Sequence, residues 1–192
     1  MTDLSPGVQN VSGALPLELA ARRIGGYVWL NRRLFEVLGG WVATSQHAET
    51  QLLLGQHCYQ HAWHAELFEA RLPQLRELSA DQFTVAPNQS ALQLLDALQA
   101  QTGIEERLAG AYRVVMPRLA TAYEAHLRLT VPITDAPVIR SLKLALTDVV
   151  EQWRAGEAVL QQLLLTSETI ERSARVVGEL ELLALGAFEF RQ

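Results

Sequence analysis

Three of the five histidines of this chain lie close together, in the stretch HCYQHAWHAE at residues 57–66. Histidine can bind a metal ion or move a proton near neutral pH, so the direction of each ring decides what the stretch can do. Successive residues of a helix are rotated by about 100°, which places His57, His61 and His64 together on the apolar side of a helix. Glu66 lies on the opposite side, so the stretch is not a His-Glu-x-x-His zinc-protease motif. The pattern therefore predicts a column of three inward imidazoles.

An inward column of imidazoles is suited to metal binding when carboxylates from other helices reach it. His57 and His61 are one helical turn apart, a spacing at which two rings can bind one ion. Glu157 lies inside an apolar arc of a later helix, and Glu36 is expected at a similar height on the first long helix. Together they predict a mixed nitrogen and oxygen site for Fe, Mn or Zn, in which His64 is a third ligand or supports the ligands.

Each of these residues also has an interpretation without a metal. The histidines are then hydrogen-bonded at the edge of the core. Glu157 is a partner of an arginine or histidine, or a general base with a raised pKa, and Glu36 pairs with Arg32. Tyr112 is either a core residue or lines the site, where it and His64 are the candidates for a catalytic role. Secondary candidates toward the other half of the bundle are His126, Asp148 and Glu151.

The composition indicates a folded protein outside the membrane. The chain has 192 residues, of which 49% are hydrophobic, enough for a substantial core. The formal net charge is −5 and no basic stripe is visible, which argues against a nucleic-acid partner. The N-terminus has no signal-peptide pattern, no apolar run is long enough to span a membrane, and Cys58 is the single cysteine. We therefore expect a cytoplasmic protein with no membrane partner.

Helical periodicity dominates the chain after its N-terminal arm. The expected parts are a flexible arm at 1–14 and one domain at 15–192, with long helices at 15–43, 46–72, 104–129 and 137–165, a short helix at 90–100 and a further helix at the C-terminus. Pro117 is expected to kink the helix at 104–129, because proline removes a backbone hydrogen bond. The pairs Gly25-Gly26 and Gly39-Gly40 are expected to allow close approach by a neighbouring element.

The connections between the four long helices are short, long and short, which resembles the ferritin-like four-helix bundle over about residues 15–165. The long connection lets the second and third long helices run parallel. Ferritin-like di-iron proteins carry Glu-x-x-His motifs, and none occurs in this chain. The resemblance therefore implies an all-α ferritin-like bundle with an additional C-terminal helix more than it implies a di-iron centre. The C-terminal helix either caps the bundle or contributes to a homodimer.

Three functions are compatible with these observations, and whether the chain is an enzyme stays open. The first is a non-haem Fe- or Mn-dependent oxidase or oxygenase acting on a small molecule in the bundle interior, a reaction class implied only by the resemblance. The second is a ferritin-like bundle without a metal, serving as a binding or scaffold protein. The third is a metal-free enzyme in which Glu157 and a histidine act as acid and base.

Overall fold

The structure is a computed structural model, and it describes residues 15–73 and 79–190, so the predicted arm at 1–14 lies outside it. The described residues are mostly helical and contain no strand, which confirms the prediction of an all-α fold. None of their helices is both long and apolar enough to cross a membrane. The elements are α1 (Leu17–Val42), α2 (Ala48–Glu69), α3 (Ala80–Phe83), α4 (Gln89–Gln99), α5 (Ile104–Ala109), the π-helical η1 (Gly110–Val115), α6 (Met116–Leu127), α7 (Ala136–Leu163) and α8 (Ser167–Ala184).

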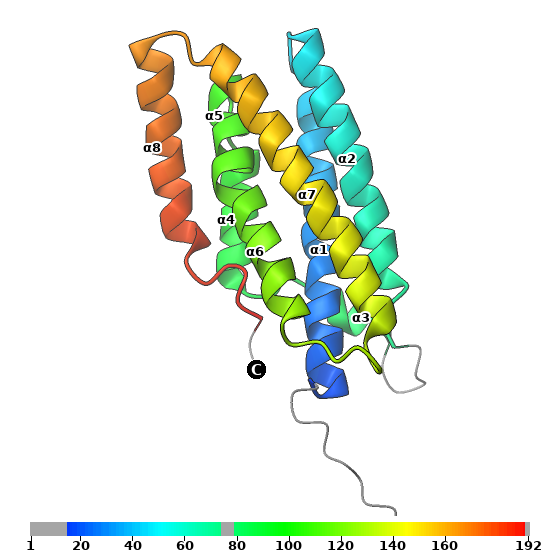
Figure 1. Cartoon of the computed structure of the whole chain (residues 1–192). Helices are drawn as coiled ribbons and strands as arrows, with labels where there is room; N and C mark the ends of the chain where they lie inside the picture. Colours follow the sequence, from blue (N-terminus) through cyan, green and yellow to red (C-terminus); the bar gives the residue numbers. More distant parts are fainter. Residues whose placement is uncertain (1–14, 74–78, 191–192) are drawn as a thin grey trace, which may run out of the picture.

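The long helices stand side by side as a bundle (Figure 1). A short turn joins α1 to α2, and these two helices are antiparallel. The chain then returns along the bundle through α3 and α4, so that α2 and the α5–η1–α6 segment run in the same direction. The next helix, α7, runs the opposite way and packs on both α2 and α6. The last helix, α8, lies outside these helices, against α4, α5 and η1.

Helix α1 buries one apolar stripe, whereas the face that α7 turns to the interior also includes a polar residue. The buried stripe of α1 comprises Tyr27, Leu30, Leu34, Val37, Leu38 and Trp41. On α7, the inward positions are Val149, Gln152 and Gly156, while Trp153 is 39% exposed. The inward face of α7 therefore buries a polar side chain, Gln152, beside Gln60 of α2.

The irregularity predicted at Pro117 takes the form of η1, which ends two residues before it. In a regular α-helix the proline ring would clash with the carbonyl group four residues earlier, which belongs to Arg113. Arg113 lies within η1, where the wider π turn changes the spacing between successive turns. Single π turns inside α-helices are frequent at functional sites. Here η1 contains Tyr112, which is fully buried.

Close approach at the first glycine pair is confirmed. A Cβ atom at Gly25 would lie 2.1 Å from the carbonyl oxygen of Phe83, and one at Gly26 would lie 2.6 Å from Cε1 of Phe190. In the second pair, a Cβ atom at Gly39 would lie 3.0 Å from Sγ of Cys58, whereas Gly40 has no neighbour within 4 Å of the same position. The first pair thus lets the 83–88 segment and the C-terminal segment pack directly on α1.

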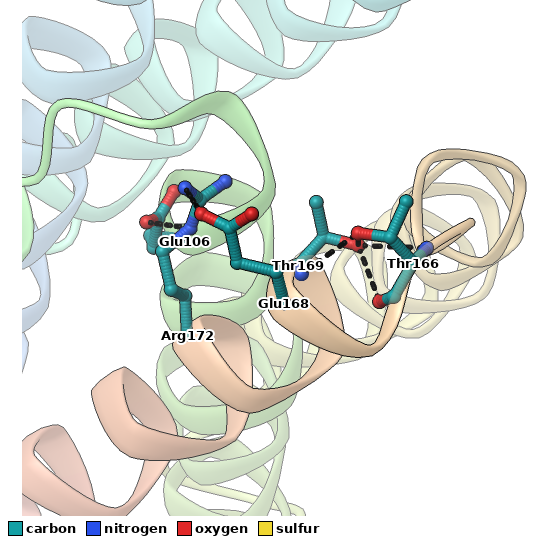
Figure 2. A network of polar contacts seen from close by, with 5 residues as sticks. All are labelled: Glu106, Thr166, Glu168, Thr169 and Arg172. Atoms are coloured by element: carbon teal, nitrogen blue, oxygen red, sulfur yellow. Dashed lines mark hydrogen bonds and ion pairs between the residues drawn. The ribbon is translucent and has the colours of Figure 1, made fainter.

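Helix α8 is fixed at its first turn by a polar network (Figure 2). The side chains of Thr166 and Thr169 form a capping box, in which each accepts a hydrogen bond from the other residue's backbone N–H. Arg172 contacts Glu168 at 3.0 Å and Glu106 of α5 at 3.2 Å. This network holds the outer helix on α5 and involves none of the predicted site residues.

Candidate functional site

The predicted column of histidines is buried between α2 and its neighbours. His57, His61 and His64 are 3%, 0% and 0% exposed, and Glu66 is exposed on the other side of α2. Because α2 and α7 are antiparallel, each histidine lies beside a different turn of α7. The interior therefore has three levels, which we call the His57, His61 and His64 layers.

In the His57 layer, the imidazole shares a hydrogen bond of 2.7 Å between its Nδ1 and the Tyr112 hydroxyl. The tyrosine ring reaches this position because α7 has a glycine there: a Cβ atom at Gly156 would lie 2.2 Å from the ring. Burial lowers the pKa of His57 to about 4 and raises the pKa of Tyr112. This layer is therefore a neutral pair near neutral pH.

In the His61 layer, Asn31 of α1 determines which ring nitrogen carries the proton. The Asn31 side-chain nitrogen donates to the Tyr27 carbonyl oxygen at 2.8 Å and to the Tyr123 hydroxyl at 2.8 Å. A carbonyl oxygen only accepts, so the Asn31 side-chain oxygen must be the atom that faces His61 Nδ1, at 2.8 Å. That oxygen also only accepts, so His61 Nδ1 carries the hydrogen and donates.

Burial decides the charge of His61. It lowers the pKa of the ring well below its usual value, and the neighbouring His64 and His57 lower it further. The Gln152 side chain lies close to the ring and raises its pKa in part. The neutral ring has a single proton, on Nδ1, so Nε2 presents a lone pair to the interior.

In the His64 layer, the ring pairs with α7. His64 Nε2 lies 2.8 Å from Oδ2 of Asp148, whose side chain is 25% exposed. Burial lowers the pKa of His64, although the hydrogen bond that it donates to Asp148 opposes this shift. A carboxylate oxygen accepts, so His64 donates from Nε2 and has its lone pair on Nδ1.

Three buried acceptor atoms remain without a hydrogen-bond partner in this region. They are His61 Nε2, His64 Nδ1 and Oε1 of Gln152. Gln152 is 1% exposed, and its nitrogen donates to Oε1 of Gln60 at 2.9 Å. Buried polar atoms in proteins nearly always have a partner, so three acceptors without one indicate a site for a cation or a donor.

The two predicted carboxylates are bound by arginines. Glu157 accepts two hydrogen bonds from Arg113, at 2.8 and 2.9 Å, and a third from Gln161. This pairing lowers the pKa of Glu157, which is the opposite of the raised pKa expected for a general base. Glu36 is exposed and pairs with Arg33 at 2.6 Å, whereas Arg32, its predicted partner, pairs with Glu69. Neither glutamate is therefore free to complete a carboxylate-rich di-iron centre of the ferritin-like kind.

The secondary candidates fall in different places. His126 is buried, with its Nδ1 lacking a partner, and stacks at 5.6 Å on the Tyr27 ring. Glu151 is exposed, whereas Asp148 is the partner of His64. Over residues 15–73 and 79–190, no group of three or more His, Cys, Asp or Glu side chains is arranged to hold a metal ion.

Three residues of this region were not among those predicted from the sequence, namely Asn31, Gln152 and Arg113. Asn31 carried a detectable signal, since it is a polar residue one turn after Tyr27 within an apolar stripe. Gln152 carried a weaker one, three residues after Val149 on α7. Arg113 gave none, because its pairing with Glu157 depends on how two distant helices are placed.

Comparisons of this chain with protein-family models, with curated proteins and with solved structures find no match.

Proposed function

We propose that this chain is a ferritin-like helical bundle that binds a metal ion through the histidines of α2 and uses it to oxidise a small molecule in the bundle interior. The observation that carries the proposal is the pair of bare nitrogens, His61 Nε2 and His64 Nδ1. The opposite nitrogen of each ring is held by Asn31 or Asp148, respectively. Metal-binding histidines in proteins are commonly oriented in this way.

The expected metal is iron, because imidazole nitrogens suit Fe and an iron centre in a helical bundle supports reactions with O2. Manganese is the weaker expectation, since it prefers carboxylate ligands and both predicted glutamates are paired with arginine. The arrangement of the long helices supports the reaction class, and the bare nitrogens support the metal.

Metal analysis of the full chain tests the proposal. Protein purified without a chelator, and then loaded anaerobically with Fe(II), should retain close to one metal ion per chain after desalting. Exposure to air should then change its absorption spectrum and consume O2. A metal content that stays at a small fraction of one ion per chain would contradict the proposal.

A second candidate is the bundle without a metal, serving as a binding or scaffold protein. It is favoured by the observation that each inward histidine already has a partner from another helix, namely Tyr112, Asn31 or Asp148. In this case the polar layers fix how the helices pack, and function does not depend on a metal. Thermal unfolding separates the two candidates, because without a metal site the transition should be identical with EDTA and with Fe(II).

A further inference from the structure

The three acceptors without partners come from two neighbouring helices in matched register. His64 and Asp148 are in contact, and Gln152 lies one turn beyond Asp148, toward His61. On α2, the step from His64 to His61 is also about one turn, in the antiparallel direction. The two imidazole rings are 5.8 Å apart and nearly perpendicular. The His61 and His64 layers are thus adjacent.

Hydrogen bonds on the far side of these three groups leave their acceptor atoms facing the interior. Asn31 holds the proton of His61 on Nδ1, and Asp148 holds that of His64 on Nε2. The Gln152 nitrogen is occupied by the Gln60 oxygen, which leaves the Gln152 oxygen for the interior. Imidazole nitrogens are good ligands for a divalent transition-metal ion, and the amide oxygen is a weaker ligand that can complete the set. The three atoms are all acceptors, so they make no hydrogen bond with one another.

We infer that His61 Nε2, His64 Nδ1 and Gln152 Oε1 form the binding site of a single divalent transition-metal ion between α2 and α7. This inference rests on the proposed function and gives it a specific set of ligands. It differs from the set expected from the sequence, because it includes an amide and leaves out His57 and Glu157. Asp148, behind His64, supplies the nearby negative charge that a buried cation needs.

The site also explains which glutamine is buried. Gln60, the partner of Gln152, is partly exposed on α2, whereas Gln152 is 1% exposed. A leucine at position 152 would fill the same space in an apolar interface without leaving an oxygen unpaired. A buried amide is expected there if its oxygen has a ligand to bind.

Titration with Co(II) tests the inference, since bound Co(II) has visible absorption bands that report its ligands. The full chain should bind one equivalent. His61→Gln and His64→Gln should each weaken binding by more than about tenfold, the smallest loss seen when even a supporting residue is changed. His47→Gln is the matched control, because His47 is exposed, and it should bind as the unchanged chain does.

Gln152→Glu tests the site by a gain of Co(II) affinity, a result that an unfolded variant could not give. It replaces the neutral oxygen by a carboxylate, so it should bind Co(II) more tightly than the unchanged chain does. Without metal the variant should unfold at a lower temperature, since it buries a charge, and Co(II) should restore its stability. Tighter Co(II) binding by this variant that saturates at one equivalent supports the site.

Two results would overturn the inference in distinguishable ways. Binding that His57→Gln abolishes and His61→Gln leaves unchanged would place the ion in the His57 layer, so the proposed function would stand and this site would fail. No Co(II) or Fe(II) binding by either the unchanged chain or Gln152→Glu would reject both. In that case the nitrogen and oxygen of each amide exchange places. The Gln60 nitrogen then donates to the Gln152 oxygen, and the Gln152 nitrogen donates to His61 Nε2.

Discussion

Asn31 has a stronger effect on the bundle interior than its size suggests. Its nitrogen bonds Tyr27 and Tyr123, and its oxygen bonds His61, so one amide links three of the helical segments. The carbonyl of Tyr27 fixes the orientation of the amide, and the amide fixes the tautomer of His61. The bare nitrogen in the interior is therefore a consequence of a backbone carbonyl on α1.

Replacing Asn31 by leucine should destabilise the protein by roughly 2–4 kcal/mol, because it leaves the His61 N–H and the Tyr123 hydroxyl unpaired in the core. Urea unfolding of the two proteins measures the difference. Arg32→Leu is a matched control on the next residue: it removes an exposed ion pair with Glu69 and should cost less than about 1 kcal/mol. Equal stability of the two variants would contradict the role given to Asn31.

The directions of the site residues could be predicted from the sequence, but most of their partners could not. Helical rotation alone placed His57, His61 and His64 inside, because it needs only positions within one helix. Choosing Glu157 over Asp148 as the nearest acid on α7 required the relative height of two helices. That height was estimated from the predicted helix ends, which are uncertain by a few residues. Asp148 and Glu157 are nine positions apart on α7 and therefore lie more than two turns from each other.

At the scale of elements, the fit of η1 to α7 is what brings Tyr112 into the interior. The tyrosine lies within the π turn, and the residue opposite it on α7 is Gly156. Both features are unfavourable for an isolated α-helix, since glycine and a π turn each weaken regular helical structure. Their coincidence at one level indicates that packing of the Tyr112 ring compensates for both.

Gly156→Ala should displace the Tyr112 ring and break its hydrogen bond with His57. The added methyl group would lie 2.2 Å from the ring, so the expected loss of stability is about 1–3 kcal/mol, typical of an overpacked core. The control is Gly178→Ala in α8, where the added group meets no atom within 4 Å. It should stabilise the protein by roughly 0.5–1 kcal/mol through helix propensity. Urea unfolding measures both, and a stabilising Gly156→Ala would contradict the packing argument.

Helix positions were predicted closely, whereas the local form of the third long helix was not. Apolar periodicity averages over many residues, so it located α1, α2, α4 and α7 to within about three residues at each end. A π turn adds one residue to a single turn and barely alters that average. Pro117 was the available signal, and it indicated an irregularity without saying whether it would be a kink or a wider turn.

At the scale of the whole molecule, the C-terminal segment packs on the part of α1 that also contacts His126. Its backbone is held by Asn88, whose side-chain nitrogen donates to the carbonyl oxygens of Gly186 and Glu189 at 2.8 and 3.0 Å. Phe190 then packs edge-on against Tyr27 with ring centres 4.7 Å apart. The Tyr27 ring thus lies between Phe190 of the C-terminal segment and His126 of α6.

The burial of His126 should make the protein sensitive to acid. Burial lowers the pKa of His126 from 6.5 to about 4, with Arg23 lowering it further and Asp135 opposing the shift. The unfolded chain then binds more protons than the folded one in this range, so stability falls as the pH drops below 6.5. The loss should be about 1.4 kcal/mol per pH unit, or roughly 3 kcal/mol by pH 4.

His126→Gln should reduce this dependence, because glutamine does not titrate. Urea unfolding between pH 7 and pH 4 should show a shallower decline for the variant, while the other buried histidines keep part of the slope. The slope is the informative quantity, since it separates titration from any constant packing cost of the substitution. His47→Gln removes an exposed histidine and should keep the full slope. Parallel curves for His126→Gln and the unchanged chain would contradict the lowered pKa of His126 in the folded protein.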